Sequence, residues 1–294
     1  MKLIKIFFLI CGLFLLESCS NNEEQLPTDR LEVETMPLAE ILNADGTKYV
    51  LHNSYLTHRT SDNKVLHKID ITIPKPLLLD IGYGQKKEVP FRFSFFTLID
   101  NRIALGVSPM LFGVPIPQQE EVSRQVNSYI YFVDADFKNL AKKEVQGGLL
   151  HYENGLFISY ISGLSYILYD KNLQVILKGK TTEELETYAF GAHLAKIASN
   201  FYLVLKVRKP SVGYFDTIVN LNDGTSNVID YLETNEIIKE HFAAEKYLPH
   251  LDSQSMTLVP GEQGYLKVTY NFTLYDGSKR EVFYNYDVNG KVIR

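Results

Sequence analysis

The chain of 294 residues contains no tryptophan and only two cysteines, Cys11 and Cys19, both close to its N-terminus. Residues 20 to 294 therefore can form no disulfide and offer no thiolate to a metal ion or a nucleophilic mechanism. Their stability must come from an ordinary hydrophobic core, for which the chain is long enough. The missing tryptophan also removes the side chain on which sugar rings usually stack, although nineteen tyrosines could replace it.

The motifs of common metal and nucleophile sites are missing as well. The seven histidines never occur at the His-x-x-x-His spacing of zinc sites, and no Gly-x-Ser-x-Gly motif is found. We therefore expect no metal, no cofactor and no catalytic residue. The separation of His52 and His58 would place both on one face of a continuous strand as a coupled pair; the alternative is two unrelated, half-buried histidines.

No excess of basic residues is present, because 30 lysines and arginines stand against 35 acidic residues and the formal net charge is −5. Binding to nucleic acid would require clustered lysine and arginine side chains opposite the phosphates. We therefore expect no nucleic-acid partner. Long apolar runs are also absent beyond Cys19, so the sequence predicts no second membrane segment.

The first eighteen residues have the pattern of a secretory signal peptide. Lys2 and Lys5 form a positive N-terminal region, residues 6 to 16 are an apolar run, and a small-residue cleavage site follows at Ser18. About eleven apolar residues in a helix reach roughly 17 Å, well short of the ~30 Å hydrocarbon core of a bilayer. The sequence thus predicts a signal peptide over residues 1–18 rather than a membrane-spanning helix.

The stretch Leu16-Glu17-Ser18-Cys19 resembles the lipobox of bacterial lipoproteins. The resemblance implies diacylglycerol on the Cys19 thiol, cleavage before Cys19, and acylation of the new amino group, so that palmitate-type chains anchor the protein in a membrane. Glu17 departs from the small or apolar residue usual at its position. Several acyl chains on one residue suffice for stable anchoring without a second membrane element.

Residues 19–30 are polar, contain one proline, and are predicted to form a flexible tether between lipid and domain. The pair Glu23-Glu24 resembles the acidic export signal of surface lipoproteins in Bacteroidota, and the alternative is a solvated linker. Ser20 resembles the residue that directs lipoproteins to the outer membrane. The expected location is the outer membrane, on its periplasmic face or at the cell surface. Asp216-Thr217-Ile218 resembles an O-glycosylation site of exported Bacteroidota proteins.

From about Met36 onward, short runs rich in tyrosine, phenylalanine and β-branched residues alternate with turn residues. Dipeptides such as Asn154-Gly155, Asp223-Gly224 and Asn289-Gly290 predict β-hairpins between these runs. Pairs of hairpins give four-stranded units at about 36–72, 93–143, 147–180, 189–230 and 253–294. Their lengths lie near the ~40–50 residues of propeller blades.

The sequence therefore predicts a single all-β domain over residues 31–294 that is a propeller-like repeat of about five four-stranded blades; the alternative is a β-sandwich. The segments 154–179 and 264–294 resemble blades of the divergent propellers of secreted Bacteroidota lipoproteins. Residues 233 to 248 interrupt the β pattern and predict one short helix near 235–247, with Asn235 as its cap and Pro249 as its stop. Residues 74–90 and 109–125 contain prolines and are predicted as long loops.

These observations favour a membrane-anchored binding or scaffold domain without catalytic activity, whose partner is a peptide, a glycan or another envelope protein. A carbohydrate-active hydrolase is the alternative, because five-bladed propellers include glycosidases with paired carboxylates in a central funnel. Asp80, Asp100 and Glu153 would then converge, although aspartates in turns usually cap their own backbone. A purely structural subunit of an envelope complex is a third alternative.

Overall fold

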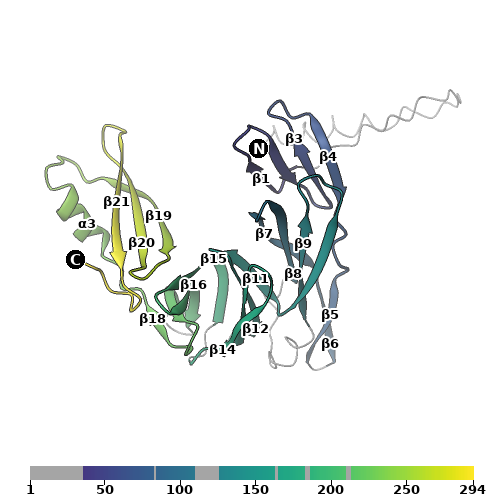
Figure 1. The fold of residues 1–294 in the computed structure, drawn as a ribbon. Helices are drawn as coiled ribbons and strands as arrows, with labels where there is room; N and C mark the ends of the chain where they lie inside the picture. Colours follow the sequence, from purple (N-terminus) through teal and green to yellow (C-terminus); the bar gives the residue numbers. More distant parts are fainter. Residues whose placement is uncertain (1–35, 83, 110–125, 163–164, 183–185, 210–212) are drawn as a thin grey trace, which may run out of the picture. The chain divides into compact units, whose positions relative to one another are not determined.

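The computed structural model describes residues 36–294 except for 83, 110–125, 163–164, 183–185 and 210–212 (Figure 1). The predicted signal peptide, Cys19 and the tether lie outside the described residues, and so does nearly all of the predicted loop 109–125. Residues 1–36 and 37–294 form separate units, of which the second holds the folded domain. Among the described residues, no helix has the length and apolarity needed to cross a bilayer.

The fold of the described residues is all-β, and five antiparallel sheets follow one another along the chain as the blades of a β-propeller arrangement, with a two-stranded sixth sheet between the first two blades in sequence (Figure 1). Blade 1 contains β1 (Ala39–Leu42), β2 (Lys48–Leu51), β3 (Tyr55–Arg59) and β4 (Val65–Asp70). Blade 2 contains β7 (Phe91–Ile99), β8 (Arg102–Pro109), β9 (Asn127–Val133) and β10 (Leu140–Gln146). Blade 3 contains β11 (Leu149–Glu153), β12 (Leu156–Ser162), β13 (Ser165–Asp170) and β14 (Val175–Lys180).

Blade 4 contains β15 (Glu186–Ile197), β16 (Asn200–Lys209), β17 (Gly213–Asn220) and β18 (Ser226–Val228). Blade 5 has three strands, β19 (His250–Val259), β20 (Tyr265–Thr273) and β21 (Lys279–Tyr286). The predicted five units are confirmed, and five blades rather than two stacked sheets exclude the sandwich. The fifth unit differs from the prediction, because the residues after β21 pair with it only through a bridge between Tyr286 and Val292.

Local turn chemistry explains the hairpins. Both residues of the turns Asp100-Asn101 and Asn154-Gly155 have positive φ, at 47° and 63° and at 52° and 78°, as two-residue turns that match strand twist require. Aspartates cap other turns: Asp287 Oδ1 accepts hydrogen bonds from the backbone N–H groups of Asn289 and Lys291, both at 2.9 Å. These bonds involve neighbours in sequence only, which is why the turns were predictable.

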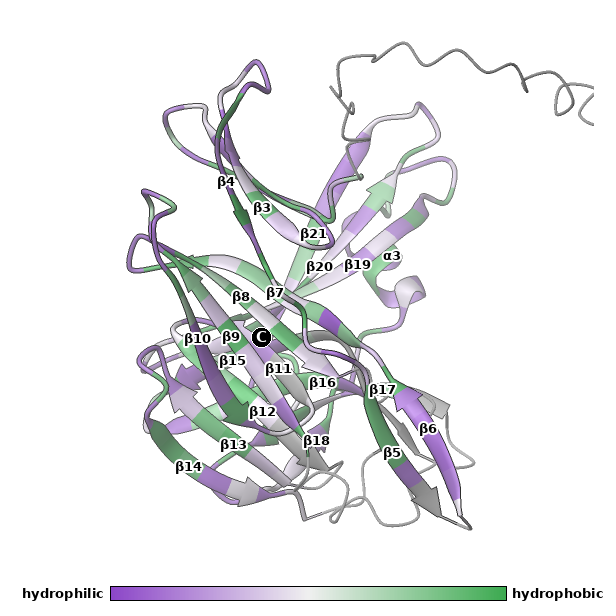
Figure 2. Cartoon of the chain, turned by 90° about the vertical axis from the view of Figure 1, so that its right-hand side faces the viewer, coloured by the Kyte–Doolittle hydropathy of each residue, from purple (hydrophilic) through white to green (hydrophobic). Residues whose placement is uncertain are grey.

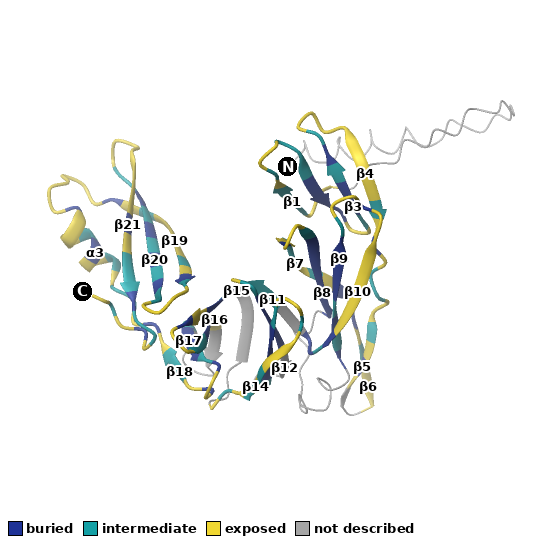
Figure 3. Cartoon of the chain, viewed as in Figure 1, coloured by how far each residue is buried: buried dark blue, intermediate teal, exposed yellow. Residues whose placement is uncertain are grey.

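The hydrophobic core lies between successive blades and not within any one of them. One cluster of buried side chains joins blades 1 and 2, and similar clusters join blades 2 and 3, 3 and 4, and 4 and 5. The first strands of neighbouring blades also contact one another, β7 with β11, β11 with β15, and β15 with β19. The last strands of blades 1 and 2, β4 and β10, are largely exposed (Figure 3). Figure 2 shows β10 as mostly hydrophilic, and also β6 (Gln85–Val89), which lies between these two blades in sequence.

The predicted helix is present as α3 (Thr234–His241), but it is shorter than expected. Glu233 and not Asn235 occupies the N-cap position, and the helix ends before Phe242. Phe242 is buried and its ring lies 4.9 Å from that of Phe272 on β20. The contact that places Phe242 in the core is with a strand thirty residues away, so helical spacing alone could not locate this end.

Residues 74–90, predicted as a loop, form a β-hairpin of β5 (Leu77–Gly82) and β6 in part. Leu79 and Val89 are buried, and Gly84 forms the turn with a φ of 71°. The loop prediction was wrong because the prolines that motivated it lie just outside the two strands, where they remove no ladder hydrogen bond.

Candidate binding site

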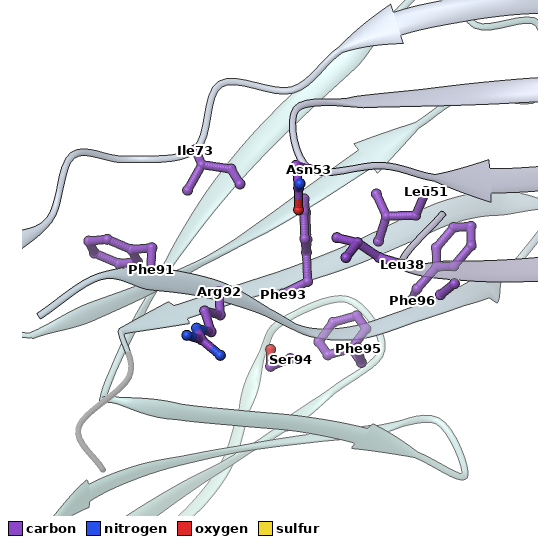
Figure 4. A pocket seen from close by; sticks show the side chains of 11 residues that line it. Leu38, Leu51, Asn53, Ile73, Phe91, Arg92, Phe93, Ser94, Phe95 and Phe96 are labelled. Carbon is purple, nitrogen blue, oxygen red and sulfur yellow. The ribbon is translucent and has the colours of Figure 1, made fainter. Parts of the chain in front are cut away.

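A pocket of about 640 Å³ lies beside β7, where blade 2 meets blade 1 (Figure 4). Blade 1 and the segment after it contribute a mainly apolar wall, and β7 contributes six consecutive residues that include four phenylalanines. This volume lies within the ~300–1,000 Å³ typical of ligand pockets, and the cavity is a groove open to solvent rather than an enclosed chamber. The lining residues are Leu38, Ala39, Leu51, Asn53, Ile73, Phe91, Arg92, Phe93, Ser94, Phe95 and Phe96. We refer to this cavity as the β7 pocket.

A β-bulge at Ser94 determines how the phenylalanines are directed. Phe93 pairs with Val107 and Phe95 with Gly106, so Ser94 is an extra residue in β7. Phe93 and Phe96 consequently pack with the core shared by blades 1 and 2, whereas Phe95 packs with the core shared by blades 2 and 3. Without the bulge, strict alternation would direct Phe93 and Phe95 to the same face.

The Phe95 ring occupies space left by a glycine on the neighbouring strand. A Cβ atom on Gly106 would lie 2.3 Å from Phe95 Cε1 and 2.7 Å from Ser94 Oγ, both far inside contact distance. The ring also contacts blade 3, with centroid distances of 5.9 Å to Tyr152 and 5.7 Å to Phe157. Gly106 and the bulge therefore hold this part of the pocket wall in position.

The polar groups of the pocket are Asn53, Arg92 and Ser94, and all three residues are exposed. Figure 4 shows Phe93 directed towards Asn53, while Arg92 and Ser94 lie on the opposite side of the strand. Arg92 forms no hydrogen bond or ion pair with any residue that the structure describes. The pocket thus combines aromatic surface with a cation that is available to an anionic group.

Sequence reasoning missed this site. The signal was present in residues 91–96, Phe-Arg-Phe-Ser-Phe-Phe, between Pro90 and the turn at Asp100. Four phenylalanines in six residues exceed what one face of a strand can bury, because alternate side chains point to opposite faces. That pattern predicts aromatic side chains on both faces of β7. The pocket also needs a second wall, which blade 1 supplies, and the pattern of residues 91–96 does not predict that wall.

Of the three carboxylates considered for a hydrolase, Glu153 lies at the end of β11 against blade 4. Its Oε2 accepts the backbone N–H of Leu194 at 2.5 Å, and its Oε1 lies 3.2 Å from His193 Nδ1. His151 Nε2 is 3.8 Å from Oε2, an ion-pair distance rather than a hydrogen bond. Burial by itself would raise the pKa of Glu153, but its contacts with His151, His193 and Leu194 outweigh burial and hold the pKa at about 2.

The other two carboxylates are held elsewhere. Asp100 lies in the β7–β8 turn, where its carboxylate is 2.8 Å from Lys171 Nζ, and Asp80 is an exposed residue of β5. The three carboxylates belong to three different sheets, and Asp100 and Glu153 contact different partners. The general acid of a glycosidase must keep its proton near neutral pH, so a pKa of about 2 excludes Glu153 from that role. The predicted convergence of Asp80, Asp100 and Glu153 is not found.

The histidines give no metal centre. The described residues contain no group of three histidine, cysteine, aspartate or glutamate side chains arranged to hold an ion. His52 follows β2 and His58 lies on β3, so a turn separates them and the single strand proposed for them does not exist. His58 instead faces His67 across β3 and β4, with ring centroids 5.9 Å apart. Burial lowers the pKa of His58, and the charge of His67 lowers it further.

The predicted O-glycosylation segment Asp216-Thr217-Ile218 lies on β17, in the middle of blade 4. Thr217 is 1% exposed and its hydroxyl oxygen is buried. A glycan cannot be attached to a side chain that is enclosed in the folded core. The structure therefore contradicts this interpretation.

No known protein family and no curated protein matches this chain. Among solved structures, BBS1N in complex with ARL6DN is similar over 86% of this chain and 67% of its own, with 12% identity and a TM-score of 0.36. A Bacteroides caccae protein of unknown function is similar over 86% and 78%, with 10% identity and a TM-score of 0.35. The Bacteroides ovatus xyloglucan PUL GH43B is similar over 86% and 53%, with 12% identity and a TM-score of 0.35. Structural similarity at this level does not indicate that this chain shares the ligands, partners or activities of those proteins.

Proposed function

We propose that this protein is a lipid-anchored envelope protein whose β-propeller domain binds a partly apolar, anionic extracytoplasmic ligand in the β7 pocket and catalyses no reaction. The observation that carries the proposal is the pocket itself, a cavity of about 640 Å³ along β7 whose lining includes four phenylalanines and an exposed Arg92. Aromatic surface supplies the binding energy, and the few polar groups orient the ligand.

The anchor is the second part of the proposal. The lipobox resemblance around Cys19 supports acylation with palmitate-type chains and attachment to the outer membrane, on either its periplasmic face or its outer surface. Several acyl chains on one cysteine give stable attachment, which a single chain does not. Intact-mass measurement of the membrane-extracted protein tests this part. A mature N-terminus without added lipid mass would contradict it.

The pocket is tested with 1-anilinonaphthalene-8-sulfonate, an apolar dye that carries an anionic sulfonate, added to the lipid-free chain from residue 20 onward. Its fluorescence should rise on saturable binding. Phe93→Ala removes an aromatic wall of the pocket. We expect the dissociation constant of the dye to rise about tenfold in this variant, which corresponds to a loss of roughly 1.4 kcal/mol of binding free energy. The dye is excited at wavelengths that aromatic side chains do not absorb, so protein emission does not interfere with the dye signal.

Phe283→Ala is the matched control, because Phe283 on β21 is 54% exposed and lies outside the pocket lining. It should leave dye affinity unchanged. Far-ultraviolet circular dichroism of both variants checks that they remain folded. Equal loss of affinity in the two variants, or no saturable binding in the parent chain, would refute a binding site at the β7 pocket.

A further inference from the structure

The β7 pocket is lined by residues from both faces of β7, whereas a ligand that lay on one face of the sheet would contact residues of that face only. Residues 91 to 96 are consecutive, and all six line the pocket. In a strand, consecutive side chains point to opposite faces. Figure 4 shows this directly, with Phe93 on one side of β7 and Arg92 and Ser94 on the other. Only a molecule that lies along the edge of the strand can reach both sets.

That edge of β7 is open. β7 is the terminal strand of its sheet and pairs with β8 alone. Among the described residues, no further backbone hydrogen bond from another element reaches Phe91–Ile99. Alternate residues of an antiparallel strand direct their N–H and C=O groups away from the paired neighbour. β7 therefore presents backbone donors and acceptors along the same edge that the pocket follows.

The length and charge of the site suit an extended peptide. Six residues of strand span about 20 Å at roughly 3.3 Å each. A peptide that adds antiparallel to β7 would place its C-terminal end beside the start of β7, where Arg92 is the second residue. Arg92 has no partner within the described part of the chain, and guanidinium groups bind carboxylates strongly.

We propose that the β7 pocket binds the C-terminal segment of a partner protein as an added antiparallel strand on the open edge of β7, with the terminal carboxylate at Arg92. Apolar side chains of the segment fill the phenylalanine-lined space on both faces, and its backbone pairs with β7. This inference rests on the proposed function, since it names the ligand class of the same pocket.

The test uses the full-length protein in phospholipid nanodiscs and fluorescence anisotropy. The ligands are a pool of fluorescein-labelled hexapeptides that carry leucine, valine, isoleucine, phenylalanine or threonine at each position, so that apolar side chains can point to both faces, and that end in a free carboxylate. The tightest member is then resynthesised as a C-terminal amide. Loss of the charged hydrogen bond should weaken binding about tenfold.

Two further variants of that peptide test strand addition. In each, the backbone nitrogens of every second residue are N-methylated, in one case at odd and in the other at even positions. Because only alternate N–H groups face β7, one set should weaken binding at least tenfold and the other should have little effect. Equal behaviour of the two sets would overturn strand addition.

Arg92→Gln locates the carboxylate. It should weaken the acid peptide about tenfold and leave the amide peptide unchanged, so that the two peptides then bind equally. Arg280→Gln is the control, because Arg280 on β21 is half exposed and lies outside the pocket lining. It should alter neither affinity. An Arg92→Gln variant that still distinguishes acid from amide would overturn the assignment of Arg92.

The outcomes separate this inference from the proposed function. If the dye binds and Phe93→Ala weakens it, but no peptide of the pool binds below about 1 mM, the pocket is a site for small apolar anions and the peptide inference is wrong. If peptides bind and Phe93→Ala has no effect on them, they bind elsewhere and the inference is also wrong. If neither dye nor peptide binds, both proposals fail.

Discussion

Glu153 connects two blades through a single carboxylate. It belongs to β11 of blade 3, and its oxygens contact the N–H of Leu194 and the imidazole of His193, both on β15 of blade 4. His151 approaches the same carboxylate from its own strand at 3.8 Å. A carboxylate in such contacts is stabilised in its ionised form, so its contribution to folding depends on pH.

We expect Glu153 to stabilise the fold at neutral pH and to lose that effect in acid. Its pKa is about 2 in the folded chain against 4.5 for an unperturbed glutamate, so the contribution is complete above about pH 4.5 and disappears as the pH falls towards 2. Allowing for the partial exposure of the group, the effect is on the order of 1–3 kcal/mol. Urea unfolding at pH 7 and pH 3 measures it.

Glu153→Gln should flatten this part of the pH dependence, while Glu262→Gln, at an exposed residue after β19, should not. An unfolding free energy that falls between pH 7 and pH 3 by the same amount in Glu153→Gln as in the parent chain would show that Glu153 is not the group responsible.

Gly106 is the second residue whose identity the structure explains. Replacement by alanine places a methyl group 2.3 Å from Phe95 Cε1, which the ring can avoid only by leaving its position. We expect Gly106→Ala to lower the free energy of unfolding by about 1–3 kcal/mol and to weaken dye binding in the pocket. In a Phe95→Ala background the same substitution should cost little, and a full cost there would contradict the contact.

At the scale of elements, side chains of one blade form hydrogen bonds and packing contacts with the next blade, as Tyr166 shows. Tyr166 on β13 of blade 3 covers Gly179 on β14, where an added Cβ would lie 2.4 Å from the tyrosine oxygen. Its hydroxyl donates a 2.8 Å hydrogen bond to the carbonyl of Leu221, beyond the end of β17 in blade 4. Burial, with a smaller contribution from Asp223, raises the pKa of Tyr166 to about 12. The hydroxyl therefore remains a donor at every ordinary pH.

Tyr166→Phe should lower the free energy of unfolding by about 1–3 kcal/mol, because the buried Leu221 carbonyl loses its partner while packing is kept. Tyr275→Phe serves as the control, since Tyr275 is 80% exposed. Thermal or urea unfolding of the two variants compares them. A Tyr166→Phe variant as stable as the parent would mean that the bond between blades 3 and 4 contributes nothing.

On the scale of the whole molecule, the folded domain and the predicted anchor belong to separate parts of the chain. Residues 37–294 form one unit, and Cys19 lies outside the residues that the structure describes. A substitution at Cys19 should therefore affect attachment to the membrane and leave the core and the β7 pocket unchanged.

For Cys19→Ser we expect loss of lipid mass and failure of lipoprotein processing, because serine offers no thiol for the diacylglycerol. The parent protein should remain with membranes through a wash in 1 M salt and leave them only in detergent. Mass spectrometry of the parent and variant chains tests lipid attachment, and their dye affinities test whether the β7 pocket is unchanged. A Cys19→Ser chain that still gains lipid mass would show that the anchor lies elsewhere.

The sequence by itself determined the fold class and the order of the blades. Asn-Gly and Asp-Gly turns, positive φ at Asn154 and Gly155, and aspartate caps such as Asp287 depend on residues within a few positions of one another. Because each blade consists of consecutive hairpins, the order of the blades can be predicted from these local turn signals. The prediction erred where a distant contact decided the local structure, as at Phe242, where a strand of blade 5 ends the helix.

Only the tertiary structure decided the sites. Leu51 and Phe93 line one pocket although forty-two positions separate them, and Glu153 meets His193 across forty. Such contacts depend on how one blade packs against the next, and that packing is set by the summed burial of side chains from both. The spacing of residues along the chain does not encode this packing between blades. Arg92 and the phenylalanines beside it were therefore recognised as a site from the tertiary structure and not from a sequence motif.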